Sequence, residues 1–388
     1  MAVRRNDMDR YHGFEQGPIR PPSEAGSLLV RVTRNCPWNR CAFCPVYKGA
    51  PFSVRPETHV ITDIDALHRH VQTLKRLADP SGQILRQPIN EQMRDLGPED
   101  QQSFGAALNW YAGGMTSIFL QDANSLVVKP DALIRILNHL RSRFPWVARI
   151  TSYARSHTIA RISDDNLRQM RAAGLNRIHI GLESGSDAVL KMVRKGVDKQ
   201  TQIKAGEKVK KAGMELSEYV MPGLGGRDLS ENHATETADA LNRINPDFIR
   251  LRTLAIPAGI PLAEEHRKGR FVKLNDVEVI REIRLFIESL AGITSMIVSD
   301  HILNLFEEVQ GRLPDAKADI LAALDRFLAL SPHDQCRFQV GRRLGIFTRL
   351  ADMNSPKRRA KADAFCAQHG ITPDNVDAII DQMMMRFI

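Results

Sequence analysis

Three cysteines stand within nine positions of a chain that has only five, in the segment TRNCPWNRCAFCPVYKG, residues 33–49. Such spacing has three chemical interpretations: part of a disulfide framework, a zinc site, or three thiolate ligands of an iron–sulfur cluster. A secreted disulfide framework would have denser cysteines spread along the chain, so the disulfide interpretation is set aside. Cys336 and Cys366 lie far downstream in helical sequence and are interpreted as buried or incidental thiols.

A structural zinc site needs a fourth ligand with its own spacing. No second cysteine or histidine pair is visible, because the nearest histidines, His12 and His59, are isolated. Three thiolates from one loop can instead hold three irons of a [4Fe–4S] cluster and leave the fourth iron open to a substrate or cofactor. The sequence favours this interpretation, with Cys36, Cys41 and Cys44 as the ligands.

The cysteine loop directly follows a predicted strand, and residues 27–262 resemble the radical S-adenosylmethionine (SAM) superfamily. Two residues separate Cys41 from Cys44, as in the common family signature, and Phe43 precedes the last cysteine as the family prefers. Four residues, rather than three, separate Cys36 from Cys41, so the spacing is a variant. The resemblance implies a [4Fe–4S] cluster and SAM as cofactors. It also implies reductive cleavage of SAM to a 5′-deoxyadenosyl radical that abstracts hydrogen from a substrate, and a flavodoxin- or ferredoxin-type electron donor.

The segment HIGLESGSDAVLKMVRKG, residues 179–196, carries the second signal. It is similar to the fourth-strand segment of the branch with coproporphyrinogen dehydrogenases, methylthiotransferases and the elongator acetyltransferase. The resemblance implies that Glu183 contacts the SAM ribose and that Lys195, with Arg194 as its rival, meets the SAM carboxylate. Ser184 and Gly185 would let the backbone approach the ligand before a helix starts. A capped turn without a ligand is the alternative.

Other strand ends carry weaker signals for SAM. The family's glycine-rich turn is replaced here by QDAN, residues 121–124. By the resemblance, Asp122 would contact the SAM ammonium there; the alternative is that it caps the next helix. Ser152 or Tyr153, and Tyr219 through Met221, lie where the family packs ribose, methionine and adenine. No catalytic residue is assigned.

The elements that must position these residues alternate between strand and helix. Apolar runs between amphipathic segments predict strands at 27–34, 116–123, 147–154, 176–183, 214–221 and 246–254. Parallel strands with right-handed crossovers give an open sheet or a barrel-like arc, with the site at the C-terminal ends of the strands. With the resemblance, the predicted fold class is α/β, a partial (β/α)6 TIM-like barrel with a C-terminal helical region.

Domain boundaries are predicted where this alternation begins and stops. Residues 1–26 form an N-terminal extension, 27–262 the core barrel with an insertion at 80–112, and 263–388 the helical region. Helices are predicted in that last region over 275–290, 300–311, 315–330 and 372–387, with an edge strand over 294–299. The basic run at 357–361 is interpreted as a solvated helix face, because no aromatic residues interleave with the charges.

Alternation along the strands turns several cations toward the interior of the barrel. The substrate candidates are Arg31, His179, Arg250 and Arg252. These are more cations than the single carboxylate of SAM needs, so we predict an anionic substrate held by bidentate arginine contacts. The alternative is that the arginines pair internally with Glu183, Asp122 and Glu218. His179 is a possible proton donor, with a hydrogen-bonded structural role as its alternative.

Composition is that of a globular protein, with 43% hydrophobic and 26% charged residues. Neither a membrane span nor the apolar core of a signal peptide is visible, so a cytoplasmic protein without membrane contact is expected. The net charge of +9 favours an anionic partner and does not exclude nucleic acid. No RNA-binding or cobalamin-binding module is recognisable, which favours a small molecule. Modification of RNA or protein is one alternative, and a cluster- or haem-handling protein that binds SAM without turnover is another.

Overall fold

The computed structural model describes residues 10–385. The first nine residues of the predicted extension and the end of the helix predicted at 372–387 lie outside this range. The chain groups into two compact units, and each is described by itself. The first unit comprises residues 1–39, 46–179 and 208–215, and the second comprises 40–45, 180–207 and 216–388. The domain boundaries placed at residues 26 and 262 stay a prediction.

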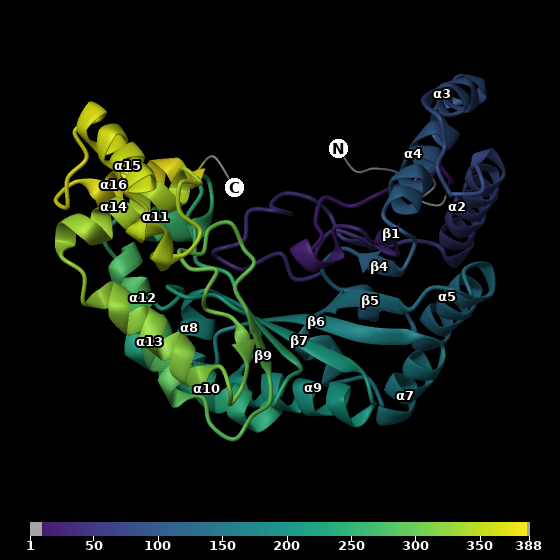
Figure 1. The fold of residues 1–388 in the computed structure, drawn as a ribbon. Helices are drawn as coiled ribbons and strands as arrows, with labels where there is room; N and C mark the ends of the chain where they lie inside the picture. The colour runs from purple at the N-terminus through teal and green to yellow at the C-terminus, as the bar shows by residue number, and fades with distance from the viewer. Residues whose placement is uncertain (1–9, 386–388) are drawn as a thin grey trace. The chain divides into compact units, whose positions relative to one another are not determined.

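A mostly parallel eight-stranded sheet has the strand order β1-β4-β5-β6-β7-β8-β9-β10 (Figure 1). Its strands are β1 (Leu28–Arg31), β4 (Ser117–Gln121), β5 (Arg149–Ala154), β6 (Leu175–Glu183), β7 (Glu215–Val220), β8 (Phe248–Leu251), β9 (Met296–Val298) and β10 (Gly311–Arg312). Each predicted core strand is present, and β9 lies within the strand predicted at 294–299. Its predicted place at the edge of the sheet is wrong, because β9 pairs with β8 on one side and with β10 on the other. The last strand, β10, pairs with β9 in the antiparallel direction. The predicted α/β fold class with a mostly parallel sheet is confirmed.

The helices that precede β6 belong to the first unit. They are α2 (Glu57–Leu77), α3 (Arg86–Asp95), α4 (Pro98–Ala112), α5 (Pro130–Arg143), α6 (Ser156–Ile159) and α7 (Asp164–Ala172), with 3-10 turns η1 (Pro22–Glu24) and η2 (Ser125–Val127). Helix α2 packs against both α4 and α5 (Figure 1). Helices α3 and α4 lie within residues 80–112, the range predicted as an insertion. Strands β2 (Thr33–Arg34) and β3 (Ser53–Val54) pair with each other in a separate antiparallel two-stranded sheet.

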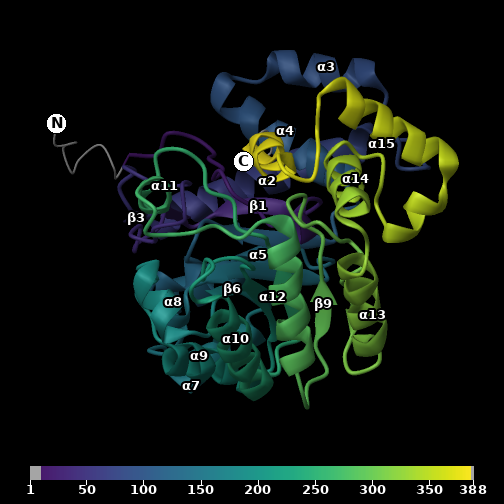
Figure 2. The ribbon, with the colours of Figure 1, turned by 90° about the vertical axis from the view of Figure 1, so that its left-hand side faces the viewer.

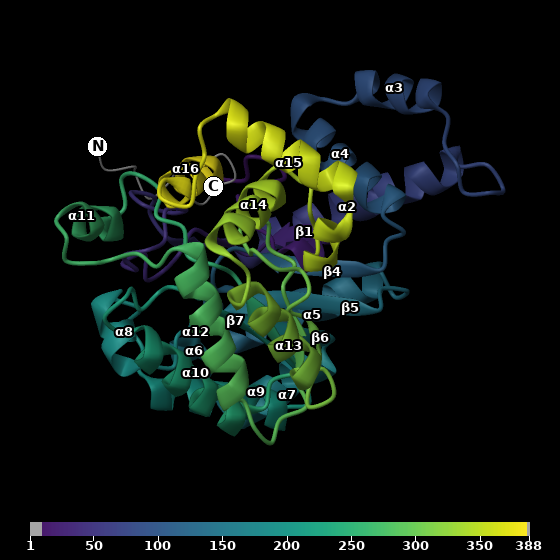
Figure 3. The same cartoon turned by 60° about the vertical axis from the view of Figure 1, so that its left-hand side comes forward.

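The remaining helices follow β6. They are α8 (Asp187–Met192), α9 (Lys199–Lys211), α10 (Ser230–Ile244), α11 (Pro261–Arg267), α12 (Asp276–Ser289), α13 (Lys317–Leu328), α14 (Pro332–Arg343), α15 (Pro356–Gln368) and α16 (Val376–Met384), with the 3-10 turn η3 (Leu350–Asn354). Figure 2 shows α12 between α10 and α13, and it packs against both. Helix α14 packs against α15 and α16 in the C-terminal region (Figure 3). The predicted C-terminal helical content is therefore largely present.

The helix predicted over 300–311 is wrong, because this segment is irregular and ends in β10. Four successive residues, Leu303 to Phe306, are all buried, which one face of a helix cannot achieve. Asn304 accepts a hydrogen bond from the Thr253 amide (2.9 Å) and donates one to the Leu251 carbonyl (2.8 Å). Its side chain thus takes the place of a backbone partner beyond the end of β8.

Two aromatic clusters show where the units bury apolar surface. In the first unit, Trp110 packs edge-to-face on Phe144 and donates its indole hydrogen to the Ser117 carbonyl at 2.9 Å. In the second, Phe338 stacks between Phe306 and Phe347. None of the helices within residues 10–385 has the length and apolar character needed to cross a membrane.

Candidate functional site

The first part of the cysteine loop belongs to the first unit. Cys36 is half-buried, and the Asn39 amide donates a hydrogen bond to its sulfur at 3.4 Å. Asn35 and Asn39 both have left-handed backbone, with φ of 68° and 45°, a conformation that asparagine tolerates better than most residues. Hydrogen bonds to a cysteine sulfur are one way in which a protein tunes a bound cluster.

Asp122 holds this part of the loop in place. Strand pairing sets Arg31 opposite Gln121, so the Asp122 carboxylate follows directly beside the end of β1. Its Oδ2 accepts hydrogen bonds from Arg31 Nε (2.7 Å) and from the Asn35 amide (3.1 Å), and its Oδ1 accepts one from the Tyr47 hydroxyl (2.9 Å). Asn35 and Tyr47 flank the three cysteines in sequence. Burial and the negative charge of Asp122 raise the pKa of Tyr47, which keeps the hydroxyl a donor.

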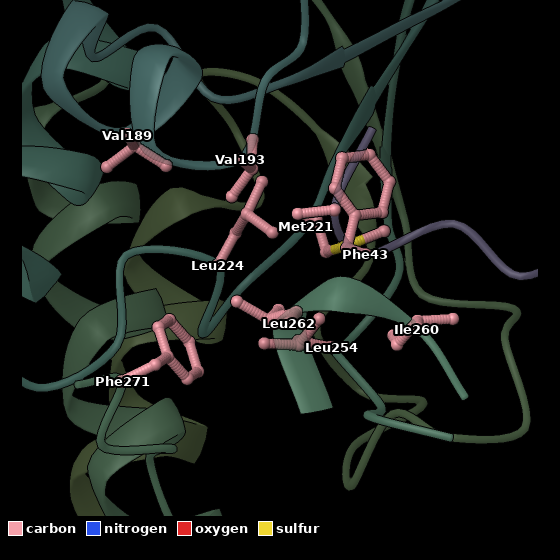
Figure 4. Packing of buried hydrophobic residues seen from close by; sticks show 10 residues of the cluster. Phe43, Val189, Val193, Met221, Leu224, Leu254, Ile260, Leu262 and Phe271 are labelled. Carbon is pink, nitrogen blue, oxygen red and sulfur yellow. The ribbon is translucent and has the colours of Figure 1, made fainter. Parts of the chain in front are cut away.

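The second part of the loop, with Cys41 and Cys44, belongs to the second unit. The Ala42 amide donates to the Val193 carbonyl (2.8 Å), and the Ala42 carbonyl accepts from the Leu262 amide (3.0 Å). Ala42 and Phe43 lie in a buried apolar cluster, against which both cysteines pack. Figure 4 shows Phe43 with other members of this cluster. The other members of the cluster are Val189, Val193, Met221, Leu224, Leu254, Ile260, Leu262 and Phe271. Backbone pairing on both sides and apolar packing therefore fix the C-x2-C segment.

Glu183 and Lys195 come together beside this segment. Lys195 Nζ donates to Glu183 Oε1 at 3.1 Å, and it lies 5.7 Å from the centre of the Phe43 ring. Gly181 leaves the space for this pair, because a Cβ there would stand 2.3 Å from Glu183 Oε1 and 3.1 Å from Lys195 Nζ. Three of the predicted SAM contacts, Phe43, Glu183 and Lys195, are thus brought together within one unit.

Glu218 is a buried carboxyl group near this pair that the sequence did not assign to the SAM site. Burial raises the pKa of Glu218 well above its usual value; Lys195 opposes this shift, and Glu183 adds to it. Within the described part of the chain, its Oε2 atom has no hydrogen-bond partner. A glutamate inside an otherwise apolar strand, LSEYV, was the sequence signal that could have found it.

Ser184 and Gly185 face helix α10 in the structure. The Ser184 hydroxyl lies 2.8 Å from His233 Nδ1, and the Gly185 amide donates to the Thr237 hydroxyl at 2.9 Å. A Cβ at Gly185 would stand 2.3 Å from the Glu236 carbonyl oxygen. Close packing against α10 therefore requires a glycine at position 185. This requirement agrees with the alternative of a capped turn, which needs no ligand to explain the glycine. A SAM contact by these two residues stays a prediction.

The weaker strand-end candidates lie in different units. Ser152 is buried in the first unit, and its hydroxyl donates to the Tyr153 carbonyl at 3.0 Å. The Tyr153 ring packs edge-to-face on Phe119. Tyr219 is half-buried on β7 in the second unit, next to Met221 of the apolar cluster. The contacts of Ser152, Tyr153 and Tyr219 with SAM stay a prediction.

Most of the predicted substrate cations have acidic partners. Arg31 pairs with Asp122 and with Glu15, and Arg250 Nη1 donates to Asp300 Oδ2 at 2.6 Å. Arg252 is exposed. Burial and, next, the charge of Arg252 lower the pKa of His301 to about 4. Internal ion pairing is thus found for Arg31 and Arg250, and only Asp122 was among the partners that the sequence suggested.

His179 is fully buried and lies 3.3 Å from Glu24 Oε1. Burial opposes ionisation of Glu24, but hydrogen bonds from His179 and Ser27 and the nearby Arg149 lower its pKa below the usual value. His179 thus has the partner that a hydrogen-bonded structural residue requires, and its role as a proton donor stays a prediction.

The residues present fit a cluster and SAM by their chemistry. The three loop cysteines form no disulfide within the described residues, and the Glu183–Lys195 pair offers an acceptor and a cation beside Gly181. Across residues 10–385, no three His, Cys, Asp or Glu side chains are gathered as a metal site requires. The assignment of the cluster to the loop therefore rests on the cysteine spacing and on the family. Cys336 and Cys366 are buried in the C-terminal helices, as the sequence predicted.

Residues 108–238 match the model of the Radical SAM superfamily. The tRNA uridine(34) acetyltransferase of Methanocaldococcus infernus is 25% identical over 122 residues, which are 31% of this chain and 23% of that protein. The enzyme of the same name from Methanocaldococcus jannaschii is 23% identical over 125 residues, 31% of this chain and 22% of that protein. This chain thus spans less than a quarter of these relatives.

Solved structures give weaker likenesses. The coproporphyrinogen III oxidase (HemN) from Escherichia coli has 16% sequence identity and a TM-score of 0.45, with 68% of this chain and 52% of that chain covered. The Methanocaldococcus infernus Elp3 has 18% identity and a TM-score of 0.39, with 48% of each chain covered. The family match includes β4 to β7 with Asp122, Glu183 and Lys195. These matched residues, about a third of the chain, are similar to the radical SAM superfamily, and the three cysteines at 36–44 lie outside them.

Proposed function

We propose that Cys36, Cys41 and Cys44 hold the [4Fe–4S] cluster and that Glu183 and Lys195 bind SAM beside Phe43. The observation that carries this proposal is the Glu183–Lys195 pair above Gly181, next to the ring that precedes the last cysteine. When bound, the cluster and SAM supply the electron and the 5′-deoxyadenosyl radical with which hydrogen is taken from the substrate.

The chain's own residues have separate tasks in this proposal. Lys195 offers its ammonium group to the carboxylate of SAM, and Glu183 accepts hydrogen bonds from the ribose hydroxyls. Each now satisfies the other at 3.1 Å, so SAM replaces this internal ion pair by an ion pair between its carboxylate and Lys195 and by hydrogen bonds from the ribose hydroxyls to Glu183. The apolar cluster around Phe43 excludes water from the side of the loop that carries Cys41 and Cys44.

We propose a small anionic molecule as the substrate. The net charge of +9 and the exposed Arg252, predicted to lie on an inward strand face, support this class. The pairing of Arg31 and Arg250 with acidic residues limits how many of the predicted cations are available.

RNA is the second candidate substrate. The two curated relatives are tRNA-modifying by name, and a strongly basic chain attracts phosphates. Against this candidate, the relatives match less than a third of this chain.

The test is anaerobic reconstitution with iron and sulfide, followed by dithionite and SAM, with 5′-deoxyadenosine measured by mass spectrometry. We expect deoxyadenosine from the wild type and none from the variant with Cys36→Ala, Cys41→Ala and Cys44→Ala, which should also retain no cluster iron. A Cys336→Ala variant is the matched control, because this buried thiol lies in the C-terminal helices. Equal iron content in the triple variant would sink the assignment of the loop.

SAM binding is tested separately by calorimetry on the reconstituted protein. Lys195→Met should lower the affinity for SAM at least tenfold, while Lys191→Met, four residues earlier and exposed on α8, should leave it unchanged. Equal affinities in the two variants would contradict the role of Lys195. Low-molecular-weight and RNA fractions of a cell extract, added separately to the deoxyadenosine assay, then distinguish the two candidate substrate classes.

A further inference from the structure

We propose that Arg31, Arg34 and Arg55 form a receptor for one carboxylate or phosphate group of the substrate, and that Glu15 occupies it as an internal anion. The inference rests on the proposed function, because it says where an anionic substrate is held. All four residues belong to the first unit.

The three guanidinium groups converge on one carboxylate. Arg34 Nε lies 3.0 Å from each carboxylate oxygen of Glu15, and its Nη2 lies 2.6 Å from Oε1. Arg31 Nη1 lies 3.1 Å from Oε2, and Arg55 Nε lies 2.7 Å from Oε1. The fork of Arg34 onto both oxygens matches the geometry of carboxylate and phosphate groups. Arg31 adds one hydrogen bond, and Arg55 adds an ion pair without hydrogen-bond geometry.

Each arginine is also held by a contact that does not involve Glu15. Arg31 Nε donates to Asp122 Oδ2 (2.7 Å), Arg34 Nη1 donates to the Ser53 hydroxyl (3.5 Å), and Arg55 Nη1 donates to Asp63 Oδ2 (2.6 Å) and to the Arg31 carbonyl (2.8 Å). These contacts keep the arginines in position when the Glu15 carboxylate leaves. A receptor held in this way loses little conformational entropy when an anion binds.

The charges around the site balance only while Glu15 is in place. Arg31, Arg34 and Arg55 face the carboxylates of Glu15, Asp63 and Asp122. Without Glu15, Arg31 still pairs with Asp122 and Arg55 with Asp63, whereas Arg34, which is 24% exposed, loses its carboxylate partner. One positive charge is then in excess, so an incoming anion is favoured there.

Glu15 itself is the displaceable member. Its side chain is 25% exposed and comes from residues 10–21, a segment without helix or strand. This segment is fixed on either side of Glu15, by the Tyr11 hydroxyl on Asp63 (2.8 Å) and by the Gly17 amide on Gln121 Oε1 (2.7 Å). The carboxylate can therefore rotate toward solvent while the segment stays in place.

The receptor is joined to the cysteine loop through Arg31. Its guanidinium contacts Asp122, and Asp122 accepts from the amide of Asn35, the residue before Cys36. An anion bound by Arg31 thus lies one hydrogen-bonded step from the start of that loop. This placement distinguishes the receptor from the many exposed arginines on the surface.

The test is calorimetric titration of inorganic phosphate into the reconstituted protein. Glu15→Gln should bind phosphate at least tenfold more tightly than the wild type, and adding Arg34→Met should remove the gain. Glu57→Gln is the matched control, because Glu57 pairs with an exposed arginine, Arg135, and should not change phosphate binding. A folded Glu15→Gln variant without increased phosphate affinity would overturn the proposal.

A second measurement covers failure of Glu15→Gln to fold. Phosphorus NMR of inorganic phosphate should show line broadening with the wild type that is lost with Arg34→Met, and equal broadening in the two proteins would overturn the proposal. Phosphate binding requires no SAM cleavage, so failure of the receptor proposal can be distinguished from failure of the proposed function. A protein that binds phosphate but makes no deoxyadenosine contradicts the proposed function alone, and the reverse result contradicts the receptor alone.

Discussion

Asp122 shows how a single buried carboxylate can organise a loop. It has left-handed backbone with φ of 74° and accepts hydrogen bonds from Arg31, Asn35 and Tyr47. The sequence offered a contact with SAM or a helix cap, and the structure shows a third role. Its partners flank the three cysteines, so we regard Asp122 as a positioning residue for the loop.

Replacing Asp122 should loosen the loop and destabilise the fold. Asp122→Ala removes the acceptor of a buried ion pair and should lower the free energy of unfolding by about 3 kcal/mol. Asp122→Asn keeps an oxygen and a side chain that tolerates positive φ, so its effect should be smaller. Urea unfolding and cluster iron after reconstitution measure both effects. Asp165→Ala, at an exposed pair with Arg168, is the control, and wild-type iron retention by Asp122→Ala would contradict the role.

Glu218 should make stability depend on pH. Burial raises its pKa in the folded protein well above the usual value of 4.5, against the attraction of Lys195 and with the repulsion of Glu183. Its contribution is therefore fully present below about pH 4.5 and is lost as the pH rises through the folded pKa. The glutamine of Glu218→Gln stays neutral at every pH. The free energy of unfolding of this variant minus that of the wild type should therefore increase from pH 5 to pH 8. A constant difference over that range, measured by urea unfolding, would show that Glu218 is not held neutral.

At the scale of elements, the turn after β6 is fixed by helix α10. The sequence ESGS suggested that Gly185 admits a ligand, but the α10 backbone fills the space where its Cβ would lie. Ser184 and Gly185 then tie this turn to His233 and Thr237 of the same helix. The turn carries Glu183 at its start, so α10 helps to set the direction of the proposed SAM contact.

Gly185→Ala should separate the turn from α10. The added methyl group would meet backbone atoms of Glu236 and Thr237 at 2.3 to 2.8 Å, so overpacking of about 1 to 3 kcal/mol is expected. Gly105→Ala on α4 meets nothing within 4 Å and should stabilise the protein by about 0.5 to 1 kcal/mol. Thermal unfolding of the two variants provides the comparison. A melting temperature of Gly185→Ala equal to the wild type would mean that the turn yields without strain.

Strand ends were predictable because they depend on local patterns. The runs that became β4 to β8 carry apolar residues between polar ones, and candidate site residues directly follow some of them, among them Asp122 after β4 and Ser184 after β6. The segment 300–311 failed because Asn304 serves as a backbone partner for Thr253 and Leu251, which lie about fifty positions earlier. Helix α9 was not predicted, because its lysine- and glutamine-rich sequence has few apolar residues to mark a buried face.

At the scale of the whole molecule, most charge pairs could not be predicted, and Arg31 with Asp122 is the suggested pair that the structure contains. Alternation predicts the face on which Arg250 lies, but its partner Asp300 follows fifty positions later, and Arg31 meets Glu15 from the N-terminal segment. Likewise, the cysteine spacing identifies one loop, whereas the structure assigns Cys36 to the first compact unit and Cys41 and Cys44 to the second. Long-range partners depend on the tertiary fold, which a local pattern does not encode.

The net charge of +9 is a property of the whole molecule. Its effect on binding provides a way to distinguish an RNA substrate from RNA that is bound only by charge. A basic surface binds RNA through phosphates, with an affinity that falls steeply with salt because counterions are released. We expect unfractionated tRNA to bind the reconstituted enzyme at 50 mM salt and to lose at least about tenfold in affinity by 200 mM. We also expect such binding to leave the rate of deoxyadenosine formation unchanged, because a small anion bound by arginines is the proposed substrate. Fluorescence anisotropy at several salt concentrations and the deoxyadenosine assay measure the two quantities. Stimulation by tRNA that persists at 200 mM salt would replace the small molecule with RNA as the substrate.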